Sequence, residues 1–189
     1  MKLLFILSLI CFALTPPRAL AYYWSFGTYV PYFNQAQTSA GGATKKFEIN
    51  PTFGVGTQLQ MVSRHYFSPE FGFTYFLDNA KNTKRDMIHL NYNFSYIMGN
   101  NFTLRYGLSN HWYRLHGLGG SVYLDNGNGT TKFPSPDKTK VSYFSTLNLG
   151  TEYLFPSKKY SVRFDLQILS FQRLENKAYN YLLSFNYYR

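Results

Sequence analysis

The sequence predicts an all-β fold, an eight-stranded antiparallel up-and-down transmembrane β-barrel. Three observations predict this fold class. Apolar and polar residues alternate along eight segments, Phe, Tyr and Trp make up 20% of the chain, and the connections between segments are alternately long and short. Alternation with a period of two sends successive side chains to opposite faces of a strand. No helical period is sustained after residue 21.

Residues 1–21 have the features of a secretory signal peptide. Lys2 precedes an almost unbroken apolar run over 3–14, and Ala19 and Ala21 are small residues at the positions that signal peptidase reads. The run is shorter than the ~20 residues that a helix needs to span a bilayer, so we expect cleavage after Ala21 rather than a membrane anchor. The barrel domain is then 22–189. It has no cysteine, because Cys11 is the only one in the chain, and we expect no disulfide.

Four strands are predicted in the first half of the domain. The first, 22–33, carries large apolar residues at alternate positions, and the second, 47–60 (FEINPTFGVGTQLQ), is apolar at nearly every odd position with glycine or polar residues between. The third, 66–77, is rich in Phe. The fourth, 87–98, alternates Ile, Leu, Tyr and Phe with His, Asn and Ser. Each segment therefore has one apolar and one polar face.

Four more strands follow. The fifth, 102–113, begins after the turn residues Gly-Asn-Asn, and the sixth, 141–155, alternates Val, Tyr and Leu with Ser, Thr and Asn. The seventh, 160–170, and the eighth, 178–189, repeat this alternation. Pro51 and Pro69 fall inside predicted strands, and because proline has no N–H we expect a β-bulge at each.

The lengths of the connections predict how the barrel is oriented. The long connections are 34–46, 78–86, 114–140 and 171–177, and the short ones are 61–65, 99–101 and 156–159. Up-and-down closure puts long loops at one end and tight turns at the other, as in outer-membrane barrels. We expect the longest loop, 114–140, to be mobile and to lie outside the cell. It carries Arg114, Lys132, Lys138 and Lys140 against Asp125 and Asp137.

The apolar face is expected to point outward into lipid. An eight-stranded barrel has an interior just wide enough for side chains to fill it, which suits the Gly, Ser, Thr and Asn of the polar face better than the many Phe and Tyr of the other. Aromatic residues near the strand ends then form two girdles. The predicted girdles are Trp24, Phe102, Phe155, Tyr160 and Tyr187 at the periplasmic rim, and Tyr32, Phe47, Tyr75, Trp112, Tyr143 and Tyr179 at the outer rim.

In this topology the whole domain resembles the small eight-stranded outer-membrane proteins of the OmpA/OmpX-like kind. The resemblance implies a monomer in the outer membrane of a Gram-negative bacterium, with outer-membrane lipid, lipopolysaccharide and the barrel-assembly machinery as partners. It also implies an assembly signal on the last strand, at Tyr179, Tyr181, Leu183, Phe185 and Tyr187. Members of the family usually end in an aromatic residue, whereas Tyr187 and Tyr188 are followed here by Arg189.

The formal net charge of +10 does not indicate nucleic acid, because Lys and Arg fall mostly in the loops and form no basic stripe. Anionic lipid headgroups suit this distribution better. Inside the predicted barrel, counting inward positions from the strand ends places five charged residues at similar height. They are Glu70, Arg105, Glu152, Arg163 and Asp165. Buried charges are costly unless paired, so we expect this charge cluster to plug the lumen, with Glu152 between the two guanidinium groups.

Two further groups of residues bear on function. His89 and His111 point inward on neighbouring strands, and a metal site there would need a third ligand such as Glu48. A hydrogen-bonded interior is favoured, with no metal or cofactor. Ser109 and Asn110 match part of the His-x-Ser-Asn pattern of the outer-membrane lipid A deacylases, which also resemble small barrels, but Gly107 stands where that pattern has histidine.

The favoured function is therefore non-enzymatic, a structural or surface-interaction role through long extracellular loops. A lipid A-modifying hydrolase and a narrow channel are the alternatives. An intact catalytic pattern on one strand would favour the hydrolase, and a lumen of glycine without charge pairs would favour the channel.

Overall fold

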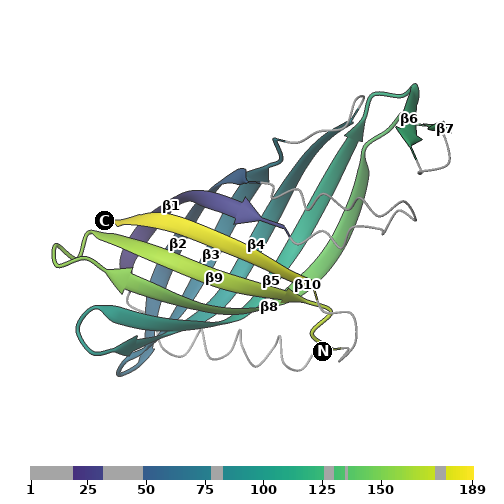
Figure 1. The fold of residues 1–189 in the computed structure, drawn as a ribbon. Coiled ribbons are helices and arrows are strands. Elements are labelled where there is room, and N and C mark those ends of the chain that lie inside the picture. The colour runs from purple at the N-terminus through teal and green to yellow at the C-terminus, as the bar shows by residue number, and fades with distance from the viewer. Residues whose placement is uncertain (1–18, 32–48, 78–82, 126–129, 135, 173–177) are drawn as a thin grey trace.

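The computed structural model describes residues 19–31, 49–77, 83–125, 130–134, 136–172 and 178–189. Eight strands close into an antiparallel barrel in the order β1-β10-β9-β8-β5-β4-β3-β2, and β6 and β7 form a separate hairpin. Figure 1 shows this hairpin at the end of the barrel opposite the tight β4–β5 and β8–β9 turns and the C-terminus. The strands are β1 (Ala19–Val30), β2 (Asn50–Val62), β3 (His65–Tyr75), β4 (Thr83–Met98), β5 (Phe102–Gly117), β6 (Ser121–Asp125), β7 (Thr130–Pro134), β8 (Lys140–Leu154), β9 (Tyr160–Leu169) and β10 (Ala178–Tyr188). The predicted fold class is confirmed.

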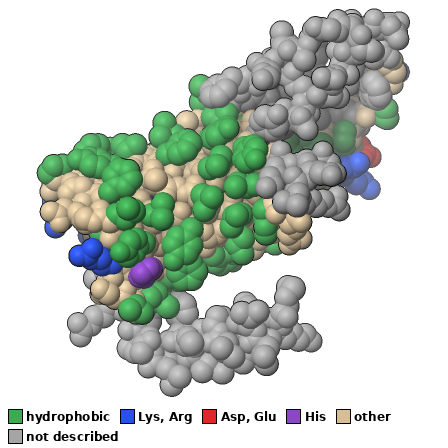
Figure 2. Space-filling model, turned by 60° about the horizontal axis from the view of Figure 1, so that its bottom comes forward, with side chains coloured by type: hydrophobic (Ala, Val, Ile, Leu, Met, Phe, Trp, Pro, Cys, Tyr) green, Lys and Arg blue, Asp and Glu red, His purple; other side chains and the backbone are tan. Residues whose placement is uncertain are grey.

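Burial alternates along the strands as the sequence predicts. In β10 every second residue from Asn180 to Tyr188 is buried, and the residues between them are exposed. Exposed large apolar side chains lie on every barrel strand, among them Phe26, Phe53, Phe73, Phe94, Leu108, Leu149, Phe164 and Leu183. Figure 2 shows such side chains spread over the barrel wall in view, with Lys and Arg gathered at its two ends. Among the described residues there is no helix long and apolar enough to cross a membrane.

The region predicted as one loop, 114–140, contains strands in place of a continuous loop, and this part of the prediction is wrong. β5 continues to Gly117 and β8 begins at Lys140, so that Arg114 pairs with Val141 and Leu115 with Lys140. Beyond this extension, β6 and β7 pair from Ser121–Pro134 to Asp125–Thr130. The loop predicted at 78–86 is also shorter, because β4 starts at Thr83.

The bulges predicted at Pro51 and Pro69 do not occur. Pro51 pairs with Thr28 and Pro69 with Tyr92 in unbroken register. Opposite Pro69 the β2–β3 pairing lapses between the Gly56–Glu70 and Leu59–Phe67 pairs, and it resumes in the same register. Because proline lacks an N–H, β3 loses a hydrogen bond to β2 at Pro69, but no extra residue is inserted and no bulge forms. The register shifts instead fall between Ala19 and Ala21 and between Gln60 and Val62, near strand ends.

Candidate functional site

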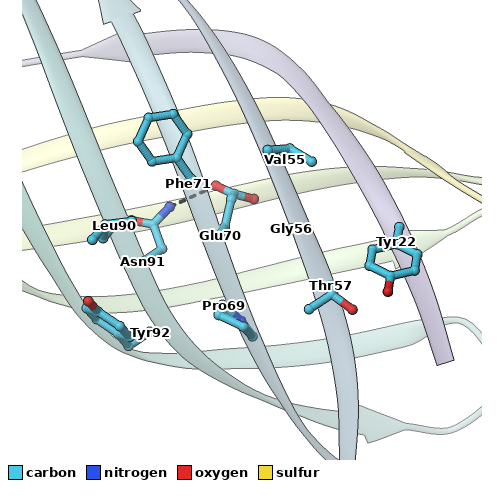
Figure 3. A pocket seen from close by; sticks show the side chains of 10 residues that line it. All are labelled: Tyr22, Val55, Gly56, Thr57, Pro69, Glu70, Phe71, Leu90, Asn91 and Tyr92. Carbon is cyan, nitrogen blue, oxygen red and sulfur yellow. Dashed lines mark hydrogen bonds between the residues drawn. The ribbon is translucent and has the colours of Figure 1, made fainter. Parts of the chain in front are cut away.

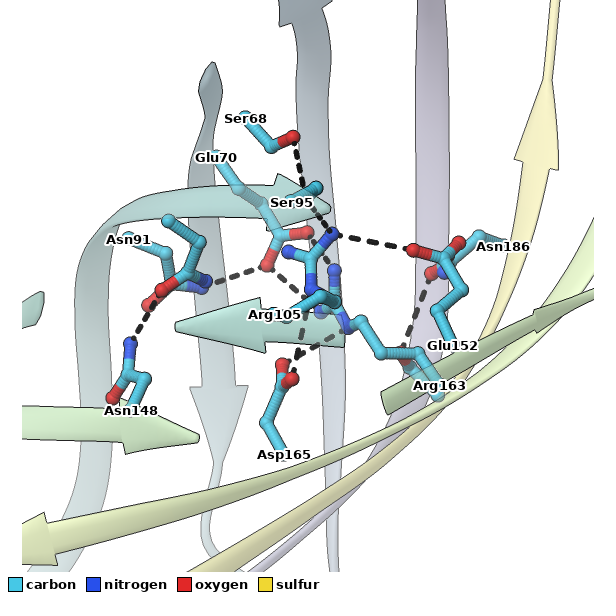
Figure 4. A network of polar contacts seen from close by, with 12 residues as sticks. Ser68, Glu70, Asn91, Ser95, Arg105, Asn148, Glu152, Arg163, Asp165 and Asn186 are labelled. Carbon is cyan, nitrogen blue, oxygen red and sulfur yellow. Dashed lines mark hydrogen bonds and ion pairs between the residues drawn. The ribbon is translucent and has the colours of Figure 1, made fainter. Parts of the chain in front are cut away.

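The five residues of the charge cluster meet inside the barrel (Figure 4). They lie in the half nearer the tight turns, because Arg105 and Arg163 are each three residues from the start of their strands. The two arginine side chains are each 1% exposed. Arg163 donates to both oxygens of Glu70, at 2.5 and 3.0 Å, and its Nε lies 3.1 Å from Asp165. Arg105 donates to Glu152 at 3.2 Å, and its Nε lies 3.6 Å from the Asp165 carboxylate. Arginine's fork suits such two-point contacts with carboxylates.

The pairing within the cluster differs from the prediction in one respect. Asp165, and not Glu152, lies between the two guanidinium groups. Glu152 and Arg163 are register partners on β8 and β9, yet the Arg163 side chain bonds to Glu70. The second oxygen of Glu152 instead accepts hydrogen bonds from Ser161 at 2.5 Å, from Asn186 at 3.1 Å and from the Tyr188 hydroxyl. Each buried carboxylate therefore has a cationic partner.

Glycines on the inward face make room for these side chains. A Cβ added at Gly150 would overlap the Asp165 carboxylate, and one at Gly56 would lie 2.5 Å from the Tyr23 ring. At Gly54 the nearest atoms belong to Glu70, at 3.2 to 3.4 Å. The glycines that alternate with apolar residues in β2 thus correspond to space that the bulky inward side chains of neighbouring strands occupy.

A layer of amides and hydroxyls lies next to the charge cluster, toward the long-loop end. Asn91 donates to Glu70 at 2.8 Å and accepts a hydrogen bond from Ser109, which in turn accepts one from Asn148. The hydroxyl of Ser109 is thereby engaged by two amide side chains. Its register partner is Asn91, and Gly107 pairs with Asn93. The one deacylase-like serine thus belongs to a hydrogen-bonded chain that continues to the charge cluster.

His89 and His111 face each other across β4 and β5, with ring centroids 6.0 Å apart. His111 bonds to Thr146 at 3.0 Å and stacks on Phe144, with 4.7 Å between the ring centroids. Glu48, the third ligand considered, lies outside the described residues. Within the described part of the chain, no group of three His, Cys, Asp or Glu side chains could hold a metal ion.

The lumen also contains an apolar layer, which the alternating pattern alone does not predict. Tyr29, Phe76, Met87 and Leu182 are buried together near the long-loop end, and Tyr113 and Phe144 pack against them. We call the first four the apolar cluster. Tyr29, Met87 and Leu182 occupy the inward positions of their strands, next to Asn50, His89 and Asn180. One signal was available, because each is a large apolar residue at a polar position of the alternation.

The residues of the predicted assembly signal lie on β10 with Tyr181, Leu183, Phe185 and Tyr187 exposed on the outer face. At the tight-turn end, Tyr160 contacts both Phe185 and Tyr187, with ring centroids 5.5 and 5.4 Å apart. At the other end, Trp112 contacts Tyr143 at 5.6 Å. Tyr32 and Phe47 of the predicted outer girdle lie outside the described residues.

No family model matches the chain, and no curated protein matches it. Similar solved structures include Ail, the attachment invasion locus protein of Yersinia pestis, with a TM-score of 0.48 and 7% identity over 89% of this chain and 97% of that one. Neisserial surface protein A has a TM-score of 0.47 and 11% identity, over 89% of this chain and 95% of that one. The N-terminal β-barrel domain of Pseudomonas aeruginosa OprF has a TM-score of 0.41 and 11% identity, over 88% and 97%. The closed antiparallel barrel of eight strands, on which the predicted resemblance rests, is present in the structure.

Proposed function

We propose that the chain is a non-enzymatic integral protein of the bacterial outer membrane, with a plugged lumen and a surface-interaction role for its long-loop end. The observation that carries the proposal is the combination of an apolar outer wall with a paired, buried charge cluster in one closed barrel. Lipid is the solvent that such a wall suits, because closure leaves no unpaired strand edge in hydrocarbon. Exposed Lys132, Lys138 and Lys140 at the long-loop end favour contacts with anionic surfaces.

The plug is proposed to block conduction. A pocket of about 140 Å³ at the tight-turn end is lined by Glu152 and Tyr188 among others, so it reaches the charge cluster. Beyond it, the paired side chains occupy the narrow interior. This arrangement favours a structural or surface role over the channel alternative, and the bonding of Ser109 to two amides gives no support to a hydrolase.

Three measurements test the proposal. The purified protein refolded in detergent should migrate differently on a gel before and after boiling, because every strand of the closed barrel is paired. Reconstituted in planar bilayers, it should show no large steady conductance. In addition, Glu152→Ala should lower the free energy of unfolding in urea by roughly 3–5 kcal/mol, since Arg105 loses a buried partner. Identical migration with helical circular dichroism, or steady conductance of the unmodified protein, would contradict the proposal.

A further inference from the structure

The outer wall of the barrel has a hollow of about 330 Å³ on the side formed by β1 to β4 (Figure 3). Outward side chains of Tyr22, Phe71 and Tyr92 border it, and all three are exposed. Smaller side chains, Val55, Thr57 and Pro69, lie between them. The buried residues Gly56, Glu70 and Asn91 also line it, so the hollow opens outward among exposed side chains and its inner boundary is formed by residues of the lumen face.

Local sequence explains why the wall is hollow here. Pro69 stands opposite Thr57, at the point where β2–β3 pairing lapses. Neither residue has the volume of the Phe and Tyr that cover the rest of this wall, and Thr57 turns its hydroxyl to donate to the Ala21 carbonyl at 3.1 Å. The irregular position Pro69 therefore leaves a depression in an otherwise continuous apolar surface.

The depth of the hollow fits one leaflet of a bilayer. Arg64 occupies the β2–β3 turn, and Pro69 is five residues further along β3. At ~3.3 Å per residue this separation is ~17 Å along the strand, and strand tilt reduces it along the membrane normal. Half of a ~30 Å hydrocarbon core is ~15 Å. A hollow at Pro69 therefore lies at acyl-chain depth when Arg64 lies at the headgroups.

The tight-turn end of the barrel is positively charged. The exposed charged side chains described there are Arg64, Lys158, Lys159 and Arg189, and the carboxylate of Glu152 is buried in the lumen. Two members of this set lie at the wall that contains the hollow. Arg64 is in the β2–β3 turn, and the backbone of Arg189 bonds to that of Tyr22 at 2.8 and 3.3 Å. An anionic headgroup therefore complements this end better than a zwitterionic one.

We propose that the hollow binds one acyl chain of an anionic phospholipid, with the lipid phosphate at Arg64. The volume is at the small end of ligand pockets, which suits a segment of one chain rather than a whole lipid. The inference rests on the proposed function, since it requires the barrel to lie in a bilayer. It adds a specific lipid site on one side of the barrel. A uniform apolar wall without a hollow would bind all lipids alike.

The two tryptophans of the chain provide the test. Trp24 is exposed on the outer wall and is the register partner of Val55, so it adjoins the hollow. Trp112 lies on β5, toward the long-loop end of the barrel. Trp112→Phe leaves Trp24 as the reporter of the hollow, and Trp24→Phe leaves Trp112 as the reporter of ordinary surrounding lipid. Each variant is reconstituted in phosphatidylcholine nanodiscs with increasing fractions of phosphatidylglycerol brominated on its acyl chains, which quenches nearby tryptophan fluorescence.

We expect Trp24 to reach half of its maximal quenching at a several-fold lower fraction of brominated lipid than Trp112. Thr57→Phe, or Val55→Phe if the first variant does not fold, should fill the hollow and bring the Trp24 curve onto that of Trp112. Thr151→Phe is the matched control, because Thr151 faces outward on β8, away from β2 and β3. Arg64→Gln should remove the preference of the hollow for brominated phosphatidylglycerol over brominated phosphatidylcholine. Lys158→Gln should leave this preference unchanged.

Coincident curves for Trp24 and Trp112 in the unfilled protein would overturn the lipid site, as would a Thr57→Phe variant that folds and is quenched as before. Absence of quenching at both tryptophans has another meaning. It would show that the chain does not lie in the bilayer, and it would contradict the proposed function itself.

Discussion

At the scale of single residues, inward glycines determine which side chains the lumen can hold. Gly150 and Gly54 lie beside different members of the charge cluster, but the space at the two positions differs. A methyl group at Gly150 would overlap the Asp165 carboxylate and lie 2.7 Å from the Phe164 carbonyl oxygen, which belongs to the backbone and cannot rotate away. For a methyl group at Gly54 the three nearest atoms all belong to the Glu70 side chain, at 3.2 Å or more.

The first prediction compares these two positions. Gly150→Ala should lower the free energy of unfolding by about 1–3 kcal/mol, the usual cost of overpacking a filled interior. Gly54→Ala should cost clearly less, because Glu70 needs to shift by only a few tenths of an ångström. Urea unfolding followed by tryptophan fluorescence in the same detergent measures both. Equal midpoints for the two variants would mean that the glycines do not limit the space of the charge cluster.

The second prediction concerns Arg163, which bonds to Glu70 and lies beside Asp165. Arg163→Met should destabilise the barrel by roughly 3–5 kcal/mol, because Glu70 loses both hydrogen bonds from the guanidinium group and stays buried. Adding Glu70→Gln should recover part of this loss, since a neutral amide needs no counter-charge. Failure of the second substitution to recover stability in the urea experiment would mean that the arginine acts mainly through packing.

The positions of the charged residues, but not their partners, follow from the sequence. Counting inward positions from the strand ends places the five residues of the cluster at similar height, and all five are buried together. The same count makes Glu152 the partner of Arg163, because they are adjacent in register. Arg163 bonds instead to Glu70 on β3, a strand on the opposite side of the barrel. Contacts across a lumen depend on strand tilt and shear, which alternation in one strand does not encode.

At the scale of elements, the alternating pattern identifies strands only where one of their faces is apolar. The end of β5 illustrates this limit, because its outward residues Arg114 and His116 are polar. They bond to Asp86 of β4, at 2.5 Å for Arg114 and 2.6 Å for His116, and His116 also bonds to Thr139 at 3.1 Å. A strand end without an apolar face shows no such alternation. The pattern therefore predicts neither the continuation of β5 to Gly117 nor the β6–β7 hairpin.

The third prediction concerns the exposure of this region on cells. Trypsin added to intact cells should cut after Lys132 or Lys138, which are exposed at the long-loop end. Lys158 and Lys159, in the turn at the opposite end, should be cut only after lysis. Mass spectrometry of the fragments distinguishes the two ends. Cleavage at Lys158 in intact cells, with protection of Lys132 and Lys138, would show that the orientation is inverted.

At the scale of the whole molecule, the lumen is filled in three layers along the barrel axis. The charge cluster fills the tight-turn half, the amides, hydroxyls and histidines follow, and the apolar cluster fills the long-loop end. Within the apolar cluster, Tyr29 and Phe76 meet edge to face with ring centroids 6.2 Å apart, and Arg85 lies over Phe76 at 5.3 Å. The charge cluster and the apolar cluster thus both lie across the lumen. Removal of one cluster should leave the other in place.

The last prediction follows from the presence of two clusters that each occupy the lumen. Glu152→Ala alone should not produce steady conductance in planar bilayers, because Phe76 and Met87 still exclude water near the long-loop end. Phe76→Ala with Met87→Ala should also stay closed, because the charge cluster is intact and ions cannot pass a narrow lumen that paired side chains occupy. The triple variant should conduct if it keeps the heat-dependent gel shift of a folded barrel. Steady conductance from either partial variant would show that one layer closes the lumen alone, and a folded but silent triple variant would assign closure to the amide layer between them.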